Sequence, residues 1–166
     1  MSFTIRRPAA RCVLLDRDHR IFLIRAEDPI DPHKPEWLEI PGGGIGSGED
    51  SAEACLRELR EETGITDVEI GPCIWTQYVE YTFAGLRFES ADRIHVAWCD
   101  GGEYAPRGLE ALEADAFISA KWWSVDDLLA SDEPTVPVRL REFLPAIAAG
   151  EIPSDPIDIA PRLSPT

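Results

Sequence analysis

The chain has 166 residues, 44% of them hydrophobic, which is enough for one domain with a sizeable core. A formal net charge of -15 opposes nonspecific binding to nucleic acid or to an anionic membrane surface. There is no apolar run of membrane-spanning length and no secretory signal at the start, so we expect a cytoplasmic protein that does not contact membranes.

Runs of β-branched, aromatic and alternating apolar residues predict the strands of a sheet. The expected strands cover residues 9–15, 21–24, 37–40, 68–83, 93–99 and 117–123. The first two are separated by the polar residues 16–20, which is typical of a hairpin connection. Residues 27–36 contain three prolines and residues 101–115 lack a regular pattern, so both segments are expected to be loops.

Apolar spacing and capping residues predict three helices. They are expected over residues 51–63, 124–129 and 138–149. After Gly150 the chain carries four prolines, which favour an extended or disordered tail over residues 151–166. We therefore expect a single domain over residues 1–150, of the α/β class, with a mixed β-sheet that carries helices on both faces.

The four cysteines are far apart in the chain and form no C-x-x-C pair. This spacing favours neither a disulfide framework nor a zinc site. We expect free, buried thiols at Cys12, Cys55, Cys73 and Cys99.

The helix expected over residues 51–63 is amphipathic and well delimited. Asp50 or Ser51 can cap its N-terminus, and Gly64 can supply a left-handed residue at its C-terminus. One stripe of the helix is apolar and is expected to pack on the sheet, while the acidic side chains face a cleft. That stripe consists of Ala52, Leu56, Leu59 and Thr63.

Three glutamates share another face of this helix. Glu58, Glu61 and Glu62 stand at i, i+3 and i+4, where like charges repel one another by roughly 0.2–0.5 kcal/mol per pair. A divalent cation would turn that repulsion into binding, and hard carboxylate oxygens suit Mg²⁺ or Mn²⁺ better than zinc. Arg57 lies beside this face, four residues from both Glu53 and Glu61.

A glycine-rich turn over residues 41–44 precedes the helix and would let the main chain approach a ligand closely. Such a turn usually suggests phosphate held at the helix N-terminus, whereas the acidic face indicates that phosphate is reached through metal ions. The combined pattern, G-x5-E-x7-R-E-hydrophobic-x-E-E-x-G-hydrophobic, runs without a mismatch from Gly43 to Ile65. Seven fixed residue types, each at a frequency of about 6%, coincide by chance on the order of once in 10⁸ starting positions.

This pattern resembles the signature of the Nudix hydrolases. Residues 37–43 (WLEIPGG) resemble the family's approach to that signature, and residues 121–128 (KWWSVDDL) resemble its late strand and short helix. The similarity runs from about residue 9 to about residue 149. The resemblance implies an α/β/α sandwich with a mixed central sheet. It also implies hydrolysis of a nucleoside diphosphate linked to another moiety, dependent on Mg²⁺ or Mn²⁺.

The resemblance also implies roles for the residues of the signature. The implied metal ligands are the carboxylates of Glu58, Glu61 and Glu62, Glu62 foremost, with the backbone carbonyl of Gly42 or Gly43 as a further ligand. Arg57 would orient the glutamates by ion pairing, and Glu49 would brace that arginine. In this family the general base is either a glutamate of the signature or an acid on a later loop. The later candidates here are Glu110 and Glu113.

Residues outside the signature are candidates for substrate contacts. Arg25 and Lys121 could meet a phosphate, and Trp37 and Trp75 could stack on a base. Tyr81 lies about where dinucleoside-polyphosphate members of the family carry a tyrosine. His95, on a strand, is expected to be structural.

Several functions remain open within and beyond this resemblance. The candidate substrates include nucleoside triphosphates, ADP-sugars and dinucleoside polyphosphates, and we expect a small-molecule partner and a possible homodimer. A Nudix-fold isopentenyl diphosphate isomerase would use a catalytic cysteine and depart from the signature. A non-catalytic nucleotide- or metabolite-binding module would commonly lack the glutamates. The complete set of glutamates favours the hydrolase.

Overall fold

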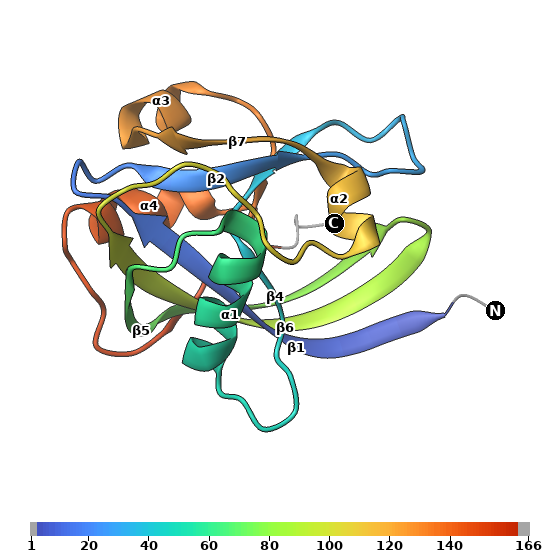
Figure 1. Ribbon diagram of the computed structural model, residues 1–166, viewed down its shortest axis with the longest axis horizontal. Helices are drawn as coiled ribbons and strands as arrows, with labels where there is room; N and C mark the ends of the chain where they lie inside the picture. Colours follow the sequence, from blue (N-terminus) through green and yellow to red (C-terminus); the bar gives the residue numbers. More distant parts are fainter. Residues whose placement is uncertain (1–2, 163–166) are drawn as a thin grey trace.

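The structure is a computed structural model that describes residues 3–162. Within these residues nine strands form one mixed sheet, around which the helices pack (Figure 1). The strands are β1 (Thr4–Leu15), β2 (Ile21–Ala26), β3 (Trp37–Glu39), β4 (Gly42–Gly44), β5 (Val68–Phe83), β6 (Leu86–Cys99), β7 (Phe117–Trp123), β8 (Thr135–Val136) and β9 (Ile157–Asp158). The helices are α1 (Ser51–Thr63), α2 (Ala111–Ala116), α3 (Val125–Ala130) and α4 (Leu140–Ala148).

The sheet has the order β8-β3-β2-β1-β6-β5-β9, with β4 paired to β1 and β7 paired to β2. Its three longest strands lie side by side, β1 parallel to β6 and β6 antiparallel to β5 (Figure 1). A two-residue turn joins β5 to β6, and both Ala84 and Gly85 adopt positive φ angles, as a type I′ hairpin turn requires. The sheet is therefore mixed, as predicted.

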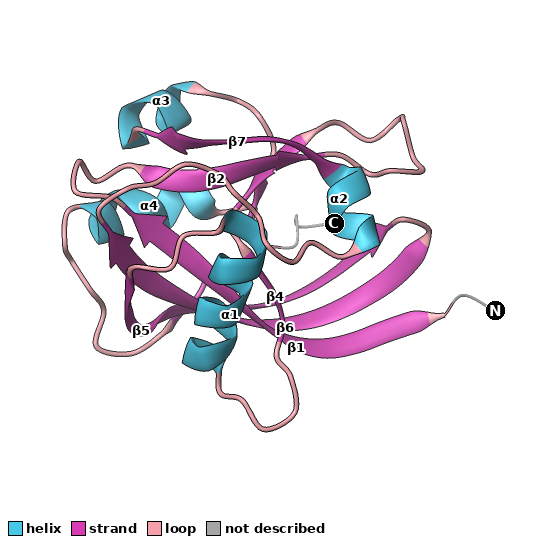
Figure 2. Ribbon diagram, viewed as in Figure 1, coloured by secondary structure: helices cyan, strands magenta, loops and turns pink. Residues whose placement is uncertain are grey.

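The core has two parts, one on each face of the sheet. Side chains alternate along β1, so that Val13 and Leu15 join the cluster under α3 and α4, while Cys12 and Leu14 join the cluster under α1. Figure 2 shows α1 and α4 on the two sides of the sheet. All four cysteines are free thiols, as predicted, but only Cys12, Cys55 and Cys99 are buried, and the prediction of a buried thiol is wrong at the half-buried Cys73. No helix within residues 3–162 is long and apolar enough to cross a membrane.

Helix α1 has the predicted bounds but a different orientation. The Asp50 side chain accepts a hydrogen bond from the Glu53 backbone nitrogen at 2.8 Å, and Gly64 is left-handed at the other end. The predicted apolar stripe is wrong at Leu56, which is 37% exposed. The buried residues of α1 are Ala54, Cys55, Glu58, Leu59, Glu62 and Thr63. Two of the glutamates therefore face the protein interior, because the neighbouring strand β4 consists of glycines and leaves room for them.

Long-range pairing accounts for the other differences from the sequence-based expectations. The expected glycine turn is strand β4, which pairs antiparallel with β1 from Ala9↔Gly44 to Arg11↔Gly42. Strand β6 begins at Leu86 rather than near residue 93 because β1 and β5 pair with its first half. The segment expected to be irregular over residues 101–115 contains the start of α2. Each of these elements is stabilised by partners distant in the sequence, which local patterns do not reveal.

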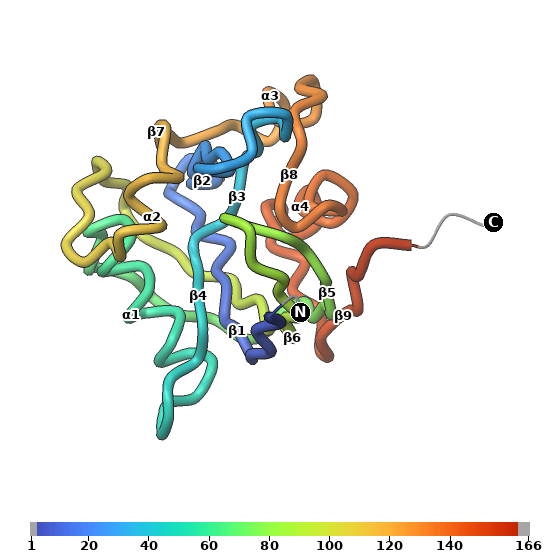
Figure 3. The backbone as a smooth tube through the Cα atoms, turned by 90° about the vertical axis from the view of Figure 1, so that its right-hand side faces the viewer, coloured from blue at the N-terminus to red at the C-terminus, as the bar shows by residue number. Residues whose placement is uncertain are grey.

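The C-terminal segment packs against the sheet. Strand β9 pairs parallel with β5 at Trp75↔Ile157 and Thr76↔Asp158, and the two strands lie together in Figure 3. Ile159 is fully buried and its backbone nitrogen donates to the Thr76 carbonyl at 2.9 Å. Residues 151–162 of the expected tail therefore run alongside the domain. Residues 163–166 lie outside the described residues.

Candidate active site

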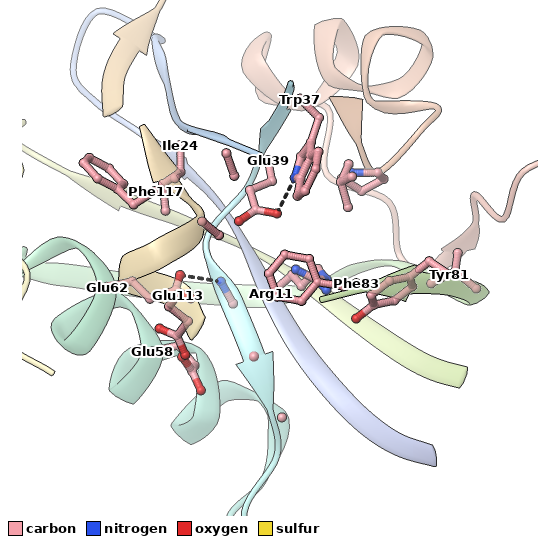
Figure 4. Close-up of a pocket in the computed structure, with 18 of the residues that line it drawn as sticks. Arg11, Ile24, Trp37, Glu39, Glu58, Glu62, Tyr81, Phe83, Glu113 and Phe117 are labelled. Atoms are coloured by element: carbon pink, nitrogen blue, oxygen red, sulfur yellow. Dashed lines mark hydrogen bonds between the residues drawn. The ribbon is translucent and has the colours of Figure 1, made fainter. Parts of the chain in front are cut away.

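A cavity of about 560 Å³ lies between α1, the glycine strand β4 and the concave parts of β1, β3 and β5. Figure 4 shows its two ends: Glu58, Glu62 and Glu113 lie on one side of the β4 ribbon, and Trp37 and Phe83 lie on the other. We call these the carboxylate end and the aromatic end.

The carboxylate end contains two buried glutamates of α1. Glu58 is 7% exposed and Glu62 is 9% exposed, and the Glu62 Oε2 atom accepts a hydrogen bond from the Gly42 backbone nitrogen at 3.0 Å. Burial raises the pKa of both carboxyl groups, most strongly that of Glu62, where the charges of Glu39 and Glu58 add to the effect. Within residues 3–162 Glu62 has no cationic partner. A buried carboxylate in this position is suited to meet a cation supplied from outside.

Glycine is required in β4 because the glutamates come close to the backbone. A Cβ atom on Gly43 would lie 2.5 Å from Glu58 Oε1, well inside van der Waals contact. A Cβ atom on Gly42 would lie 2.4 Å from the Ala10 carbonyl oxygen. The absence of side chains thus opens the strand to the carboxylates, as the sequence analysis expected, although the backbone is a strand and not a turn.

Arg57 connects the glutamates to the loop before the helix. Its Nε and Nη2 atoms contact the two Glu49 oxygens at 3.1 and 2.7 Å, and Nη1 contacts Glu58 at 2.9 Å and Glu61 at 3.2 Å. The bidentate contact with Glu49 fixes the guanidinium plane. Among residues 3–162 Arg57 forms no ion pair with Glu53, the other partner at four-residue spacing. The geometry thus agrees with the expected support of the glutamates by Arg57 and Glu49.

The side chains at the carboxylate end provide only some of the ligands that a hard divalent cation needs. Within residues 3–162 no group of three or more His, Cys, Asp or Glu side chains is arranged closely enough to hold a metal. Glu61 is half-exposed and directed to Arg57, which also engages Glu58. However, the buried oxygens of Glu58 and Glu62 beside a backbone without side chains are the ligand type that Mg²⁺ and Mn²⁺ prefer. The residues present therefore fit such an ion, provided that Glu61 or backbone carbonyls complete the site.

Glu113 of α2 lines the cavity at the carboxylate end (Figure 4). Burial, together with the charges of Glu58 and Glu110, raises its pKa to about 7. A carboxyl group with such a pKa can accept a proton from water near neutral pH. Glu110 also lines the cavity but is exposed to solvent.

Comparison with known proteins identifies the family. The family model of the NUDIX domain matches residues 5–147, most of the chain. The chain belongs to the NUDIX family. The resemblance found in the sequence around Gly43–Ile65 is thereby confirmed for the domain as a whole.

The relatives of this Nudix chain are diphosphatases and pyrophosphohydrolases by name. The RNA pyrophosphohydrolase of Caulobacter vibrioides is 42% identical over 152 residues, covering 86% of this chain and 84% of the relative. The 8-oxo-dGTP diphosphatase of Escherichia coli K12 is 29% identical over 127 residues, covering 75% of this chain and 88% of the relative. The predicted enzyme class, a Nudix hydrolase of phosphoanhydride bonds, is confirmed at this level.

A solved structure of similar shape shows the fold. An ADP-ribose pyrophosphatase from Streptococcus suis 89-1591 has a TM-score of 0.59 and is 16% identical, covering 92% of this chain and 97% of that chain. At this identity the likeness concerns the backbone alone. The predicted α/β fold with a mixed central sheet is confirmed.

The substrate contacts predicted from the sequence fall into two groups. Trp37 and Tyr81 line the cavity of the Nudix domain. Arg25 and Lys121 are not among its lining residues: Arg25 pairs with Glu133 and Glu36, and the Lys121 ammonium lies 3.9 Å from the centre of the Trp123 ring.

The remaining aromatic and histidine candidates are inside the protein. Trp75 is fully buried in the core cluster under α4, so it is placed to pack and not to stack on a ligand. His95 is hydrogen-bonded to the Ser51 hydroxyl at 2.7 Å and to the Gly71 carbonyl at 2.9 Å. The first contact ties α1 to β6 and the second ties β6 to β5, in keeping with a structural role.

Sequence reasoning missed several polar residues of the cavity. Among them are Arg7, Arg11, Glu39 and Gln77. Arg7 and Arg11 were detectable, because residues four apart on a strand project from the same face. The expected strand began at residue 9 and therefore did not include Arg7. Gln77 gave no such signal, since a single amide in a long strand marks no site by itself.

Proposed function

We propose that this Nudix protein hydrolyses a phosphoanhydride bond in a nucleoside diphosphate linked to another moiety, with Mg²⁺ or Mn²⁺ held by Glu58, Glu61 and Glu62. The observation that carries the proposal is the pair of buried carboxylates, Glu58 and Glu62, behind a strand without side chains at one end of a large cavity. The family and the names of the relatives support the reaction class.

The metal would neutralise phosphate charge and make a water molecule nucleophilic. Arg57, fixed by Glu49, pairs with Glu58, which lines the cavity, and with Glu61, which is not among the lining residues. The backbone carbonyls of Gly42 or Gly43 are further candidate ligands. Glu113 is the candidate general base, because it lines the same end of the cavity and its pKa of about 7 suits proton transfer.

Arg7 is the best-placed cation for a phosphate group. It lines the cavity, its Nη1 atom would lie 3.3 Å from a Cβ atom on Gly44, and its buried Nε atom has no hydrogen-bond partner within residues 3–162. Its charge also lowers the pKa of Glu58, although burial outweighs this effect. The geometry favours Arg7 over Arg25 and Lys121, because neither of those two residues lines the cavity.

A non-catalytic nucleotide- or metabolite-binding module is the second candidate function. One observation favours it: within residues 3–162 no preformed cluster of three carboxylates is present, and Arg57 occupies Glu58 and Glu61. A binding module would keep the cavity without needing the glutamates to release Arg57.

A hydrolysis assay separates the two functions. The purified protein is incubated with nucleoside triphosphates, ADP-ribose and diadenosine tetraphosphate in Mg²⁺, in Mn²⁺ or in EDTA, and the products are identified. We expect turnover that requires metal and is abolished in Glu62→Gln. Glu53→Gln, an exposed glutamate of the same helix, serves as the matched control and should retain activity. Binding without turnover under either metal would contradict the hydrolase and support the binding module. Light scattering of the same sample tests the predicted homodimer.

A further inference from the structure

The cavity has a buried polar floor beyond the carboxylate end. Arg11 of β1, Gln77 of β5 and Asp92 of β6 are 7%, 4% and 2% exposed, and Gln77 and Asp92 are register partners in the sheet. Asp92 Oδ2 accepts from Arg11 Nε at 3.1 Å and from Gln77 Nε2 at 2.8 Å, while Oδ1 accepts from the Ser90 hydroxyl at 2.5 Å. Three neighbouring strands thus converge on one carboxylate.

This network leaves two groups of opposite polarity without partners. A carboxylate accepts hydrogen bonds only, so Gln77 must turn its amide nitrogen to Asp92, and its Oε1 atom is buried with no partner within residues 3–162. Arg11 uses Nε for Asp92, and its Nη1 and Nη2 atoms form no hydrogen bond within the same residues. Both residues line the cavity. Because an unpaired buried carbonyl costs about 1–3 kcal/mol, a partner is expected to come from the ligand.

Aromatic side chains flank this floor. Trp37 and Phe83 meet edge to face, with ring centres 6.2 Å apart, at the aromatic end of the cavity (Figure 4). The Trp37 indole nitrogen donates to Glu39 Oε2 at 2.8 Å, which fixes the ring. Gln77 and Phe83 lie on the same face of β5, where side chains alternate. A flat ring can therefore stack on aromatic surface while its edge reaches polar atoms.

We propose that the aromatic end binds a heterocyclic base that carries a ring carbonyl next to a ring N–H, with Gln77 as a specificity-determining residue. The carbonyl accepts from the free Nη groups of Arg11, and the adjacent N–H donates to Gln77 Oε1. This inference rests on the proposed function, since it describes the base of the same substrate.

The pattern of donor and acceptor selects the class of base. Guanine, hypoxanthine and uracil present an exocyclic acceptor beside a ring donor, whereas adenine and cytosine present an exocyclic donor beside a ring acceptor. The phosphates, drawn to the carboxylate end, fix which way the ring enters, so an amino base cannot reverse itself to match. A guanidinium also suits a carbonyl oxygen, which has two lone pairs, and the O6/N7 edge of a 6-oxopurine.

Calorimetric titration with nucleoside 5′-monophosphates in Mg²⁺ measures base recognition without catalysis, because a monophosphate has no phosphoanhydride bond to hydrolyse. For the wild-type protein we expect GMP and UMP to bind on the order of tenfold more tightly than AMP and CMP, since each mismatch leaves buried groups unpaired. Methionine is similar in length to glutamine but has no amide acceptor. In Gln77→Met the ratio of these affinities should therefore fall towards one. Tyr78→Phe is the matched control, because Tyr78 is the next residue of β5 and is exposed on the other face.

The preference is a ratio of affinities within one variant, so a partly unfolded sample changes the binding stoichiometry and not the ratio. Equal affinities for oxo and amino bases in the wild type, absence of binding, or an unchanged preference in Gln77→Met would each overturn the inference. The hydrolysis assay is independent of this result. Turnover without base preference would leave the proposed function standing, and base preference without turnover would leave the inference standing.

Discussion

Replacing Gly43 by alanine tests the close approach of Glu58 to β4. The added methyl group would lie 2.5 Å from Glu58 Oε1 and 2.7 Å from its Cδ atom, while ordinary contact begins at 3.4 Å. The carboxylate must therefore retreat by about 1 Å, a misplacement that can cost on the order of 100-fold in rate. The backbone at Gly43 has no positive φ angle, so alanine fits the strand itself. We expect kcat/KM to fall about 100-fold while thermal unfolding remains close to that of the wild type.

Gly48→Ala is the contrasting variant. Gly48 has a φ of +79°, and a Cβ atom added there would meet no other atom within 4 Å, so alanine would strain the backbone without touching the cavity. Urea denaturation should show a loss of roughly 1–2 kcal/mol, with kcat/KM unchanged in the folded protein. Wild-type activity in Gly43→Ala would refute the reasoning, because it would show that Glu58 does not need its place beside the strand.

Three further predictions concern the base, the C-terminal segment and acid stability. Glu113→Gln should lower kcat by about 10²–10⁴-fold with metal affinity preserved, measured by single-turnover kinetics and calorimetry; a loss confined to metal binding would exclude the base role. Ile159→Ala removes a fully buried side chain and should lower the free energy of unfolding by about 2–5 kcal/mol, measured by chemical denaturation. A change below about 0.5 kcal/mol, which is typical of surface substitutions, would show that the segment does not pack. Burial raises the pKa of Asp28, but this effect is outweighed by its contacts with Lys34 and with the Ile30 and Ala84 amides. The net result is a folded-state pKa below the usual 3.8 of an aspartate. Its stabilising effect is therefore present above pH 3.8 and is lost as the pH falls through the lower folded-state pKa, so Asp28→Asn should flatten this acid limb of stability.

Local sequence features predicted the parts of the fold that depend on local physics. Helix α1 begins and ends where Asp50 and Gly64 provide caps, and β5 has the predicted bounds because β-branched and aromatic residues recur along its whole length. The glycine segment was misjudged, since its extended form depends on pairing with β1. The orientation of α1 was misjudged for the same reason: hydrophobicity alone would bury Leu56, but the open backbone of β4 accommodates Glu58.

The candidate site was predictable only where its chemistry lies within one short segment. Glu58, Glu61 and Glu62 are neighbours on a helix, so their spacing in the sequence already shows a shared face. Arg11, Gln77 and Asp92 come from three strands, and only the pairing of those strands brings them together. Their ion pair and hydrogen bonds therefore could not be inferred before the register of the sheet was known.

Strand β9 pairs with part of the outer edge of β5. It covers β5 only at Trp75 and Thr76, and within residues 3–162 no other strand pairs with that side of β5. Unpaired edges are templates for strand addition from another molecule. A chain cleaved after Gly150 would expose both this edge and the apolar surface that Ile159 now covers. A chain trimmed in this way is therefore expected to self-associate more readily than the untrimmed chain.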